Sequence, residues 1–301
     1  MHFITEREVK ENFDMATAID AMKDAFTEFY KGKAGADSRL RTFSQESVLS
    51  TMPAFMDKYH IAGLKSYIAS REGAKFVVLL FDTIKTELIA VVEANRLGQV
   101  RTGAVPALAT SILHGKCTTF TLVGSGFQAE TQLEGMLEIS DPEEIRVFSR
   151  TPAHGRNFVE RMSKKFGRNL EYEENLGTAL SGADVISCIT NSQDPVITDL
   201  SSTECFHLNL VGSNFLSRRE VSESVISSAD LVVVEHLEQA FRESSEISAF
   251  VNGGGTAVEL KEAVGSEEKY RKHKKTIFKS MGIGLEDIAS AYYVLKKMEL
   301  I

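Results

Sequence analysis

Thr118-Thr-Phe-Thr-Leu-Val-Gly124-Ser-Gly126-Phe-Gln-Ala129 is the stretch that decides the fold, because an apolar, β-branched run ends in glycines and opens into a helical pattern. Gly124 permits the backbone angles of a tight turn, and Gly126 lets the main chain approach a pyrophosphate. The charge of such a group lies at the free N–H groups and positive dipole end of the following helix. This GxGxxA pattern predicts a dinucleotide-phosphate site. The residues expected to contact the cofactor here are Gly124, Gly126, Phe127, Gln128 and Ala129.

The composition is that of an ordinary globular protein, with 301 residues of which 43% are hydrophobic and 25% are charged. This length suits about two domains. The net charge of −8 argues against nucleic-acid or acidic-membrane partners, because phosphate binding needs a concentrated positive field. No apolar run approaches the roughly 20 residues that span a bilayer, and the N-terminus lacks the pattern of a signal peptide. We therefore expect a cytoplasmic protein with no membrane partner.

The three cysteines, Cys117, Cys188 and Cys205, are widely spaced and odd in number. This pattern favours reduced, buried thiols. Cys205 and His207 are close in sequence, but no second His/Cys pair at ligand spacing accompanies them, so we expect no metal site.

Strand-like and helix-like segments alternate from Thr118 to about Glu235, which predicts an α/β fold with a parallel sheet and crossover helices. The expected strands are Thr119–Val123, Ile145–Ser149, Asp184–Ile189, Leu208–Val211 and Leu231–Glu235. The expected helices begin near Gln128, Pro152, Leu176 and Arg219. Thr151 is placed to cap the helix that begins at Pro152.

The segment before this region follows a different pattern. Residues Met15–Tyr30 carry apolar side chains on one face of a helix. Phe76–Phe81 and Leu88–Val92 flank a short polar connection and predict an antiparallel hairpin. This is a separate α+β region, and its apolar hairpin could cover the sheet of a second subunit, so the pattern allows a homodimer.

The C-terminal segment predicts a short strand and turn at Thr276–Gly282, followed by a helix over Leu285–Met298 that can return to the first region. Upstream, Thr256-Ala-Val-Glu259 matches a capping box for a short helix.

Ser149-Arg-Thr151 stands where a dinucleotide-binding domain normally carries an acidic residue for the ribose 2′-hydroxyl, about 20 residues past the glycines. Arg150 can pair bidentately with a 2′-phosphate, and Ser149 and Thr151 can donate hydrogen bonds to it. The sequence therefore favours NADP(H) over NAD(H). The alternative is that Arg150 is a solvated loop residue that stacks on the adenine.

Several segments together resemble the ornithine cyclodeaminase and μ-crystallin family over nearly the whole chain. Besides Gly124–Ala129, they are Val100-Arg-Thr-Gly-Ala104, Ala183-Asp-Val with Thr190 and Pro195-Val-Ile, Phe278-Lys-Ser-Met-Gly282, and Glu286-Asp287. The resemblance implies a homodimer in which a Rossmann-type, doubly wound parallel sheet is inserted in an α+β substrate and dimerisation domain. The implied boundaries are residues 1–114 for substrate binding and dimerisation, 115–280 for NAD(P) binding, and 281–301 for a C-terminal helix that returns to the first domain.

Members of this family include ornithine and lysine cyclodeaminases, archaeal-type alanine dehydrogenases and a ketimine reductase. All move a hydride between a nicotinamide and an amino or imino carbon beside a carboxylate. That reaction needs fixed cations for the carboxylate and a proton donor or acceptor at the nitrogen. The resemblance implies that Arg41 and Arg101 bind the carboxylate, although Arg39 is close enough to take the place of Arg41. It also places Thr102, Thr190, Val211 and Ser280 at the cofactor.

Lys65 matches the active-site lysine of the family. Two arginines and a cationic nicotinamide nearby would lower its pKa, so that it could exchange a proton with the substrate nitrogen near neutral pH. Without the resemblance, each of these cations would be interpreted as a surface salt-bridge partner.

Asn214 stands where cyclodeaminases and alanine dehydrogenases carry an aspartate, and we count it among the catalytic residues. An amide cannot take up a proton or pair ionically with a second amino group. We therefore expect an NADPH-dependent reductase of a small α-imino acid, or an amino-acid dehydrogenase in the reverse direction. The alternatives are an ornithine cyclodeaminase, which makes proline and ammonia, and an NADPH-binding protein without turnover. The retained Arg41, Lys65 and Arg101 argue against the last of these.

Overall fold

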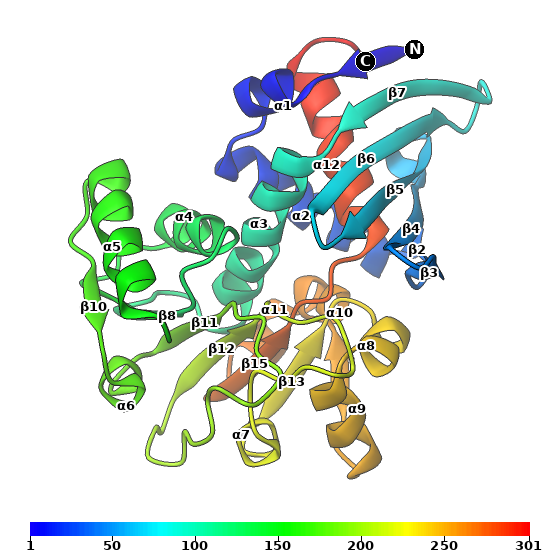
Figure 1. Cartoon of the computed structure of the whole chain (residues 1–301). Coiled ribbons are helices and arrows are strands. Elements are labelled where there is room, and N and C mark those ends of the chain that lie inside the picture. Colours follow the sequence, from blue (N-terminus) through cyan, green and yellow to red (C-terminus); the bar gives the residue numbers. More distant parts are fainter. The chain divides into compact units, whose positions relative to one another are not determined.

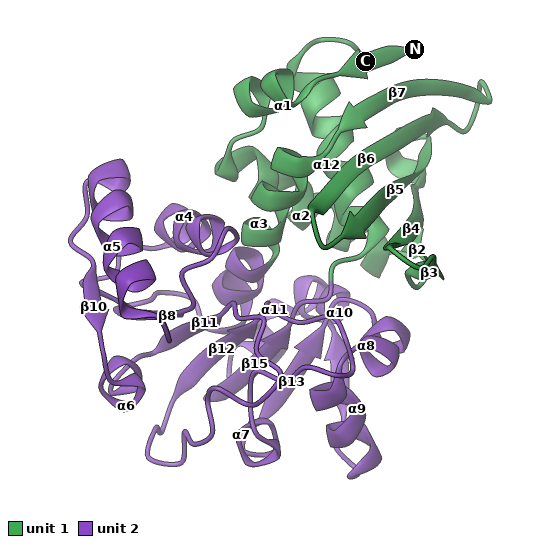
Figure 2. Cartoon of the chain, in the orientation of Figure 1, with its two compact units in different colours: residues 1–105, 282–301 green, residues 106–281 purple.

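The computed structural model describes residues 1–301, which form two compact units (Figures 1 and 2). Unit 1 consists of Met1–Val105 and Gly282–Ile301, and unit 2 is the continuous segment Pro106–Met281. The division falls inside helix α3 (Asn95–Leu113), whereas the predicted boundary at residue 114 lies at the end of this helix. None of the helices has the length and apolar character that a membrane span requires.

An eight-stranded sheet forms the centre of unit 2, with the order β10-β9-β8-β11-β12-β15-β13-β14. All of its neighbouring strands are parallel. The strands are β8 (Thr119–Val123), β9 (Glu144–Phe148), β10 (Glu171–Glu173), β11 (Val185–Cys188), β12 (Phe206–Leu210), β13 (Leu231–Val234), β14 (Ala257–Glu259) and β15 (Lys275–Lys279). The strand order reverses between β8 and β11, and open α/β sheets bind ligands at such a switch point, beyond the carboxyl ends of the strands.

The helices of unit 2 are α4 (Ala129–Ile139), α5 (Pro152–Phe166), α6 (Leu176–Leu180), α7 (Glu223–Ser227), α8 (Leu237–Glu243), α9 (Ser245–Asn252), α10 (Leu260–Gly265) and α11 (Glu267–Tyr270). Every residue of β11, β12 and β13 is buried, as expected for parallel strands that are covered on both faces. The predicted Rossmann-type α/β fold is confirmed.

Unit 1 contains a seven-stranded mixed sheet with the order β1-β7-β6-β5-β4-β2, and β3 also pairs with β4. Its strands are β1 (His2–Ile4), β2 (Ala34–Ala36), β3 (Leu40–Phe43), β4 (Ser47–Met56), β5 (Ile61–Ser70), β6 (Gly73–Asp82) and β7 (Glu87–Glu93). Its helices are α1 (Glu6–Asn12), α2 (Met15–Tyr30), the first part of α3, and α12 (Gly284–Lys297), with a short 3-10 turn at Asp57–Tyr59. Helix α12 packs against α2 and against strands β4, β5 and β6.

The two faces of this sheet differ in their burial. On β4, the buried Ser50, Met52, Ala54 and Met56 alternate with more exposed residues. The second face carries large apolar side chains that remain exposed, namely Leu49 (45%), Phe55 (41%), Ile68 (48%) and Phe81 (38%). Leu49 lies opposite Ile68, and both Phe55 and Phe81 lie opposite Ala62, so these side chains share one face. We call Leu49, Phe55, Ile68 and Phe81 the open apolar face.

Several local expectations hold. Helix α2 has the predicted bounds Met15–Tyr30, because its buried residues recur at helical spacing. The predicted hairpin is formed by β6 and β7, which pair antiparallel. Helix α4 begins one residue after Gln128, and α5 begins at Pro152.

Three other local expectations are wrong. Residues Ala257–Glu259 form strand β14, which pairs with β13, so sheet pairing overrides the capping pattern that begins at Thr256. The helix expected near Arg219 begins at Glu223 because Ser222 caps it. Thr151 occupies the N-cap position of α5, but its side chain makes no capping hydrogen bond.

The three cysteines are free thiols. Cys117 and Cys188 are buried as expected. Cys205 is exposed, contrary to the prediction, because it lies in the loop that precedes β12. His207 on β12 is buried and bonds to Thr276 and Asn209, and burial lowers its pKa to about 3.

Candidate active site

A cavity of about 710 Å³ lies in unit 2 beyond the carboxyl ends of β8, β9, β11 and β12. The predicted cofactor residues that line it are Gly124, Gly126, Phe127, Gln128, Ser149, Arg150, Thr151, Thr190 and Val211. Sequence reasoning missed a further part of the wall, which consists of Ser125, Leu176, Ile189, Asn191, Ser192, Asp194, Pro195, Val196 and Gly212 among others. Most of these follow β11, where Thr190 and Pro195-Val-Ile belong to the family motifs but only Thr190 is expected to contact the cofactor.

The glycine turn after β8 has the geometry that a pyrophosphate site needs. Gly124 has a φ of 121°, and a Cβ atom at this position would lie 2.5 Å from the carbonyl oxygen of Ile189. A Cβ at Gly126 would meet nothing within 4 Å, so this side of the turn is open to a ligand. Helix α4 begins directly afterwards, and the Gln128 side chain makes no capping bond to it. Its amino end can therefore receive an anionic group.

Ala129 does not line the cavity. It is fully buried and belongs to the core cluster that includes Phe120 and Leu122 of β8. The small side chain therefore serves the close packing of α4 on the sheet.

The segment Ser149–Thr151 follows β9 and lines the cavity. The Ser149 hydroxyl accepts a hydrogen bond from the Ser125 hydroxyl, 2.9 Å away, which joins this segment to the glycine turn. Arg150 is exposed. The one carboxylate among the lining residues is that of Asp194, which follows β11 rather than β9. The end of β9 is therefore cationic and not anionic.

Two further predicted cofactor residues, besides Ala129, do not line this cavity. The Ser280 hydroxyl is buried and donates to Oε1 of Glu235, 2.6 Å away. Thr102 belongs to unit 1, where its hydroxyl donates to the carbonyl of Gly98 within α3. The roles of these two residues remain predictions.

A second group of predicted residues forms a buried charged cluster in unit 1. Lys65 on β5 is 4% exposed and Arg101 on α3 is 6% exposed. The Lys65 Nζ atom lies 3.1 Å from Oδ1 of Asp287. Arg101 donates from Nη1 to Oε2 of Glu286 at 2.6 Å and from Nε to the same Asp287 oxygen at 3.0 Å. Asp287 Oδ2 has no hydrogen-bond partner in the protein.

Helix α12 positions the two carboxylates because its amino end lies close against β4. A Cβ atom at Gly284 would lie 2.2 Å from the carbonyl oxygen of Met52, so only glycine permits this approach. Met52 pairs with Lys65 across the sheet. Glu286 and Asp287, in the first turn of α12, are thereby brought to the strand that carries Lys65.

The environment of Lys65 favours its neutral form. The pKa of Lys65 is lowered to about 8, mainly by burial and then by the charges of Arg101 and Arg39, while Asp287 opposes this shift. The aromatic rings of Phe76 and Tyr67 lie 5.1 and 5.9 Å from Nζ. The direction matches the prediction, but burial rather than the neighbouring cations is the largest cause. A lysine with this pKa can accept or donate a proton near neutral pH.

Both candidate arginines lie on the covered face of the sheet. Arg41 on β3 pairs with Ser50, which pairs with Tyr67 of β5. Arg39 reaches the cluster itself, since its Nε atom lies 3.3 Å from the Met52 sulfur and its Nη2 atom 3.2 Å from the carbonyl oxygen of Gly282. Its charge also acts on Lys65. The structure thus places Arg39 beside Lys65.

Asn214 lies in the loop after β12 and is half-buried. It follows Gly212, which lines the nucleotide cavity, and the buried Ser213. The predicted site residues therefore fall into two sets, with the charged cluster in unit 1 and the nucleotide cavity with Asn214 in unit 2.

The chain matches the model of the ornithine cyclodeaminase/mu-crystallin family over residues 1–300. It belongs to this family. The resemblance inferred from the sequence is confirmed, and so is the enzyme class that it implies, an NAD(P)-dependent oxidoreductase.

Three proteins of this family are informative. The chain is 28% identical to the Delta(1)-pyrroline-2-carboxylate reductase of Bacillus cereus over 269 residues, which is 84% of this chain and 82% of the relative. The solved Delta(1)-pyrroline-2-carboxylate reductase of Thermococcus litoralis, in complex with NADH and L-proline, superposes with a TM-score of 0.91 at 25% identity and covers 99% of this chain and 98% of that one. An archaeal alanine dehydrogenase dimer with bound NAD gives a TM-score of 0.90 at 25% identity and covers 99% and 95%.

Proposed function

We propose that this member of the ornithine cyclodeaminase/mu-crystallin family reduces a small α-imino acid with NADPH, or oxidises the corresponding amino acid in reverse. The buried Lys65, held between Asp287 and two arginines, carries the proposal, because it offers a proton at neutral pH beside fixed positive charge. The relatives support it, since two of them are named for the reduction of an imino acid and one for the oxidation of alanine.

We assign the substrate carboxylate to Arg39 and Arg101. A guanidinium group holds a carboxylate in a fixed plane, and both arginines are anchored by other contacts, Arg39 to Gly282 and Arg101 to Glu286. Arg41, on the same face, is the alternative to Arg39. Lys65 donates a proton to the nitrogen during reduction and accepts one during oxidation. The bound nicotinamide supplies or accepts the hydride.

We propose a preference for NADPH over NADH. The end of β9 carries no acid that would repel a 2′-phosphate, and Arg150, Ser149 and Thr151 all line the cavity there. Arg150 is exposed, so its guanidinium can turn toward an incoming phosphate. Two solved relatives hold NADH or NAD, so the proposed preference for NADPH rests on the residues that follow β9 in this chain.

We also propose a homodimer that buries the open apolar face. Leu49, Phe55, Ile68 and Phe81 are large apolar side chains that stay exposed on one face of the sheet, and contiguous exposed apolar patches often mark interaction sites. The dimeric archaeal alanine dehydrogenase supports this proposal.

An absorbance assay of nucleotide oxidation tests the function. NADPH and NADH are each offered with cyclic imines that carry a carboxylate, and with α-keto acids plus ammonia. We expect NADPH-dependent turnover with at least one imino acid, and its loss in Lys65→Met. Proline and ammonia released from ornithine, with no net change in the nucleotide, would instead indicate a cyclodeaminase. Nucleotide binding without turnover across the panel would indicate a protein that only binds NADPH.

A further inference from the structure

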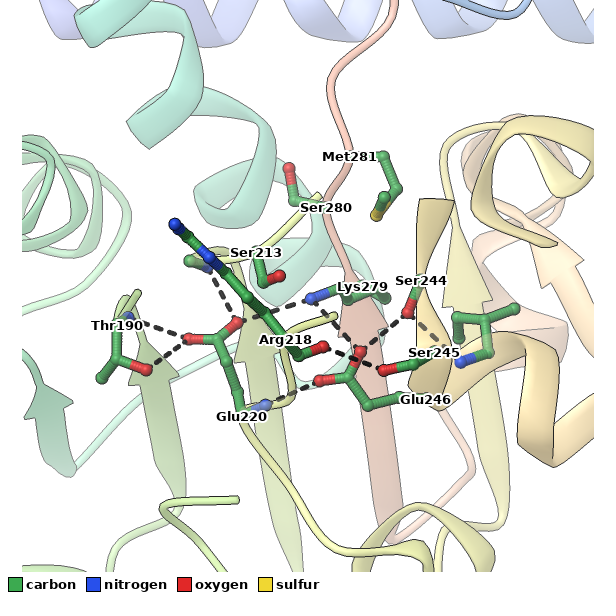
Figure 3. A network of polar contacts seen from close by, with 12 residues as sticks. Thr190, Ser213, Arg218, Glu220, Ser244, Ser245, Glu246, Lys279, Ser280 and Met281 are labelled. Carbon is green, nitrogen blue, oxygen red and sulfur yellow. Dashed lines mark hydrogen bonds and ion pairs between the residues drawn. The ribbon is translucent and has the colours of Figure 1, made fainter. Parts of the chain in front are cut away.

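Unit 2 contains a second buried charged cluster, shown in Figure 3. Glu220, Lys279 and Glu246 are 0%, 0% and 3% exposed. The Lys279 Nζ atom on β15 lies 3.5 Å from Oε2 of Glu220 and 3.8 Å from Oε2 of Glu246. Burying three charges carries a large desolvation cost, and such clusters are weak evidence for stability. We therefore consider which segments of the main chain this cluster holds in place.

The Glu220 carboxylate bonds to the ends of two neighbouring strands (Figure 3). Its Oε1 atom accepts from the N–H of Thr190 at 2.9 Å and from the Thr190 hydroxyl at 3.3 Å. Its Oε2 atom accepts from the N–H of Gly212 at 2.8 Å. Thr190 follows β11, Gly212 follows β12, and both line the nucleotide cavity. One side chain thus bridges two segments of the cavity wall.

The two segments touch at this point. A Cβ atom at Gly212 would lie 1.8 Å from the carbonyl oxygen of Thr190 and 2.5 Å from Oε1 of Glu220. Glycine is therefore required there, and the loop that carries Asn214 begins at this contact. Both Glu220 oxygens act as acceptors. Burial raises the pKa of Glu220, whereas Lys279 and the amides of Thr190 and Gly212 favour its ionised form.

The other members of the cluster contact the main chain and the carboxylate of Glu220. Glu246 accepts from the Glu220 N–H at 2.7 Å and from the Ser244 hydroxyl at 2.8 Å. The Ser245 hydroxyl donates to the carbonyl of Arg218 at 2.9 Å. Helix α9, which begins at Ser245, therefore fixes the main chain around Glu220, while the Lys279 ammonium compensates the charge of its side chain.

We propose that Glu220 is a positioning residue for the nucleotide cavity, which sets the spacing between Thr190 and Gly212 and the start of the Asn214 loop. The inference rests on the proposed function only in that the cavity binds a nicotinamide nucleotide. It is independent of which imino or amino acid reacts.

The test compares Glu220→Gln with a matched variant, Glu246→Gln. A glutamine amide nitrogen cannot accept a hydrogen bond, so Glu220→Gln leaves one cavity amide without its acceptor. We expect the dissociation constant for NADPH to rise by about tenfold or more, because the freed amide no longer holds Thr190 and Gly212 at the spacing that the nucleotide needs. Glu246 shares the lysine and the burial but contacts no cavity-lining residue in the cluster. The glutamine of Glu246→Gln keeps an amide oxygen that can accept from the Glu220 N–H, so the main chain of Glu220 stays in place. Glu246→Gln should therefore lower the melting temperature to a similar extent and change the dissociation constant by less than about twofold.

Binding is measured by fluorescence titration well below the melting temperature of each variant, which separates a positioning role from a purely structural one. Glu220→Asp serves as a second variant, because it keeps the charge beside Lys279 and shortens the side chain so that it cannot bridge both amides. If Glu220→Gln does not fold, the same rise is expected in Glu220→Asp. Folded variants of Glu220 that bind NADPH as tightly as the wild type would overturn the inference, as would an equal loss in Glu246→Gln. A wild-type protein that binds NADPH but reduces no imino acid would overturn the proposed function alone.

Discussion

Lys65 and Asp287 form an ion pair inside unit 1, with Nζ and Oδ1 3.1 Å apart and with side chains that are 5% and 0% exposed. The same Asp287 oxygen also accepts from Arg101. One carboxylate oxygen is thus shared between the proposed proton donor and a proposed substrate-binding arginine. Burial is the largest cause of the lowered pKa of Lys65, and Arg101 adds to it while Asp287 opposes it.

The pH dependence of the reaction should report on Lys65. Only protonated Lys65 can donate a proton, so kcat/KM for reduction should fall as the pH rises through about 8, the pKa of this lysine. In the oxidative direction, kcat/KM should rise over the same range. Lys65→Met should abolish this pH-dependent change, which is one limb of the pH profile, and lower kcat/KM by about 10²- to 10⁴-fold, the usual contribution of a general acid. A wild-type profile that stays flat through this range would exclude the role.

Asp287→Asn should move the same limb toward lower pH. Asn has no charge to stabilise the ammonium, so the pKa of Lys65 falls below about 8 and less of it is protonated at neutral pH. Measurements of kcat/KM from about pH 5 to about pH 10 locate this limb of the pH profile. Glu286→Gln is the control, because this carboxylate pairs with Nη1 of Arg101. The limb of the pH profile should shift less in Glu286→Gln than in Asp287→Asn. A limb that moves to higher pH in Asp287→Asn would contradict the assignment.

Arg150→Ala should weaken NADPH selectively. The lost guanidinium–phosphate contact costs about 1.5–3 kcal/mol, which is on the order of 10- to 100-fold in the dissociation constant. Affinity for NADH should not change, because NADH lacks the 2′-phosphate. Arg156→Ala is the matched control, since Arg156 is an exposed arginine on α5 that pairs with Glu174 away from the cavity. Titration with both nucleotides measures the effect, and tighter binding of NADH by the wild type would refute the preference.

Gly124→Ala and Gly126→Ala should separate folding from binding. Gly124 needs a positive φ, and its Cβ would collide with the Ile189 carbonyl, so Gly124→Ala should reduce the free energy of unfolding by about 1–3 kcal/mol. Gly126 has open space around it, so Gly126→Ala should leave stability unchanged and weaken NADPH binding, because the methyl group obstructs the approach of the pyrophosphate. Urea unfolding and nucleotide titration measure the two effects. A folded Gly126→Ala variant that binds NADPH as tightly as the wild type would contradict a role of this turn in binding.

Ile68→Arg should disrupt the proposed dimer. Ile68 is 48% exposed at the open apolar face, and a buried unpaired charge at an interface opposes association. Phe241→Arg is the control, because Phe241 on α8 is similarly exposed, at 43%, but belongs to unit 2. Sedimentation should give a monomer for Ile68→Arg and a dimer for the wild type and Phe241→Arg. A monomeric wild type would remove the proposed dimer altogether.

The sequence predicted the features that depend on neighbouring residues. The turn at Gly124, helix α2 and the hairpin of β6 and β7 each follow from a local pattern of glycine or apolar spacing. The ion pairs of Lys65 and Arg101 with Asp287 could not be predicted, because they join residues 222 and 186 positions apart. In the sequence, Glu286 and Asp287 are recognisable only as part of a family motif. The structure shows that they lie beside these cations.

The choice between Arg39 and Arg41 could not be made from the sequence for a related reason. Residues two apart in an extended segment share a face, so both arginines satisfy the same pattern. The contacts of Arg39 with Met52 and Gly282 place it at the charged cluster. The pairing of Lys279 could have been predicted. A lysine within the apolar run Thr276-Ile-Phe-Lys279 needs a partner of opposite charge if the strand is buried.

The discontinuity of unit 1 has a consequence for biosynthesis. Unit 2 is one continuous segment, and domains generally fold as units while the chain is being made. Unit 1 cannot be complete before residues 282–301 have been made. Until α12 leaves the ribosome, Lys65 and Arg101 therefore lack the carboxylates that compensate their charges. We expect newly made chains to acquire the nucleotide-binding unit first, and the charged cluster around Lys65 to form as the last step of maturation.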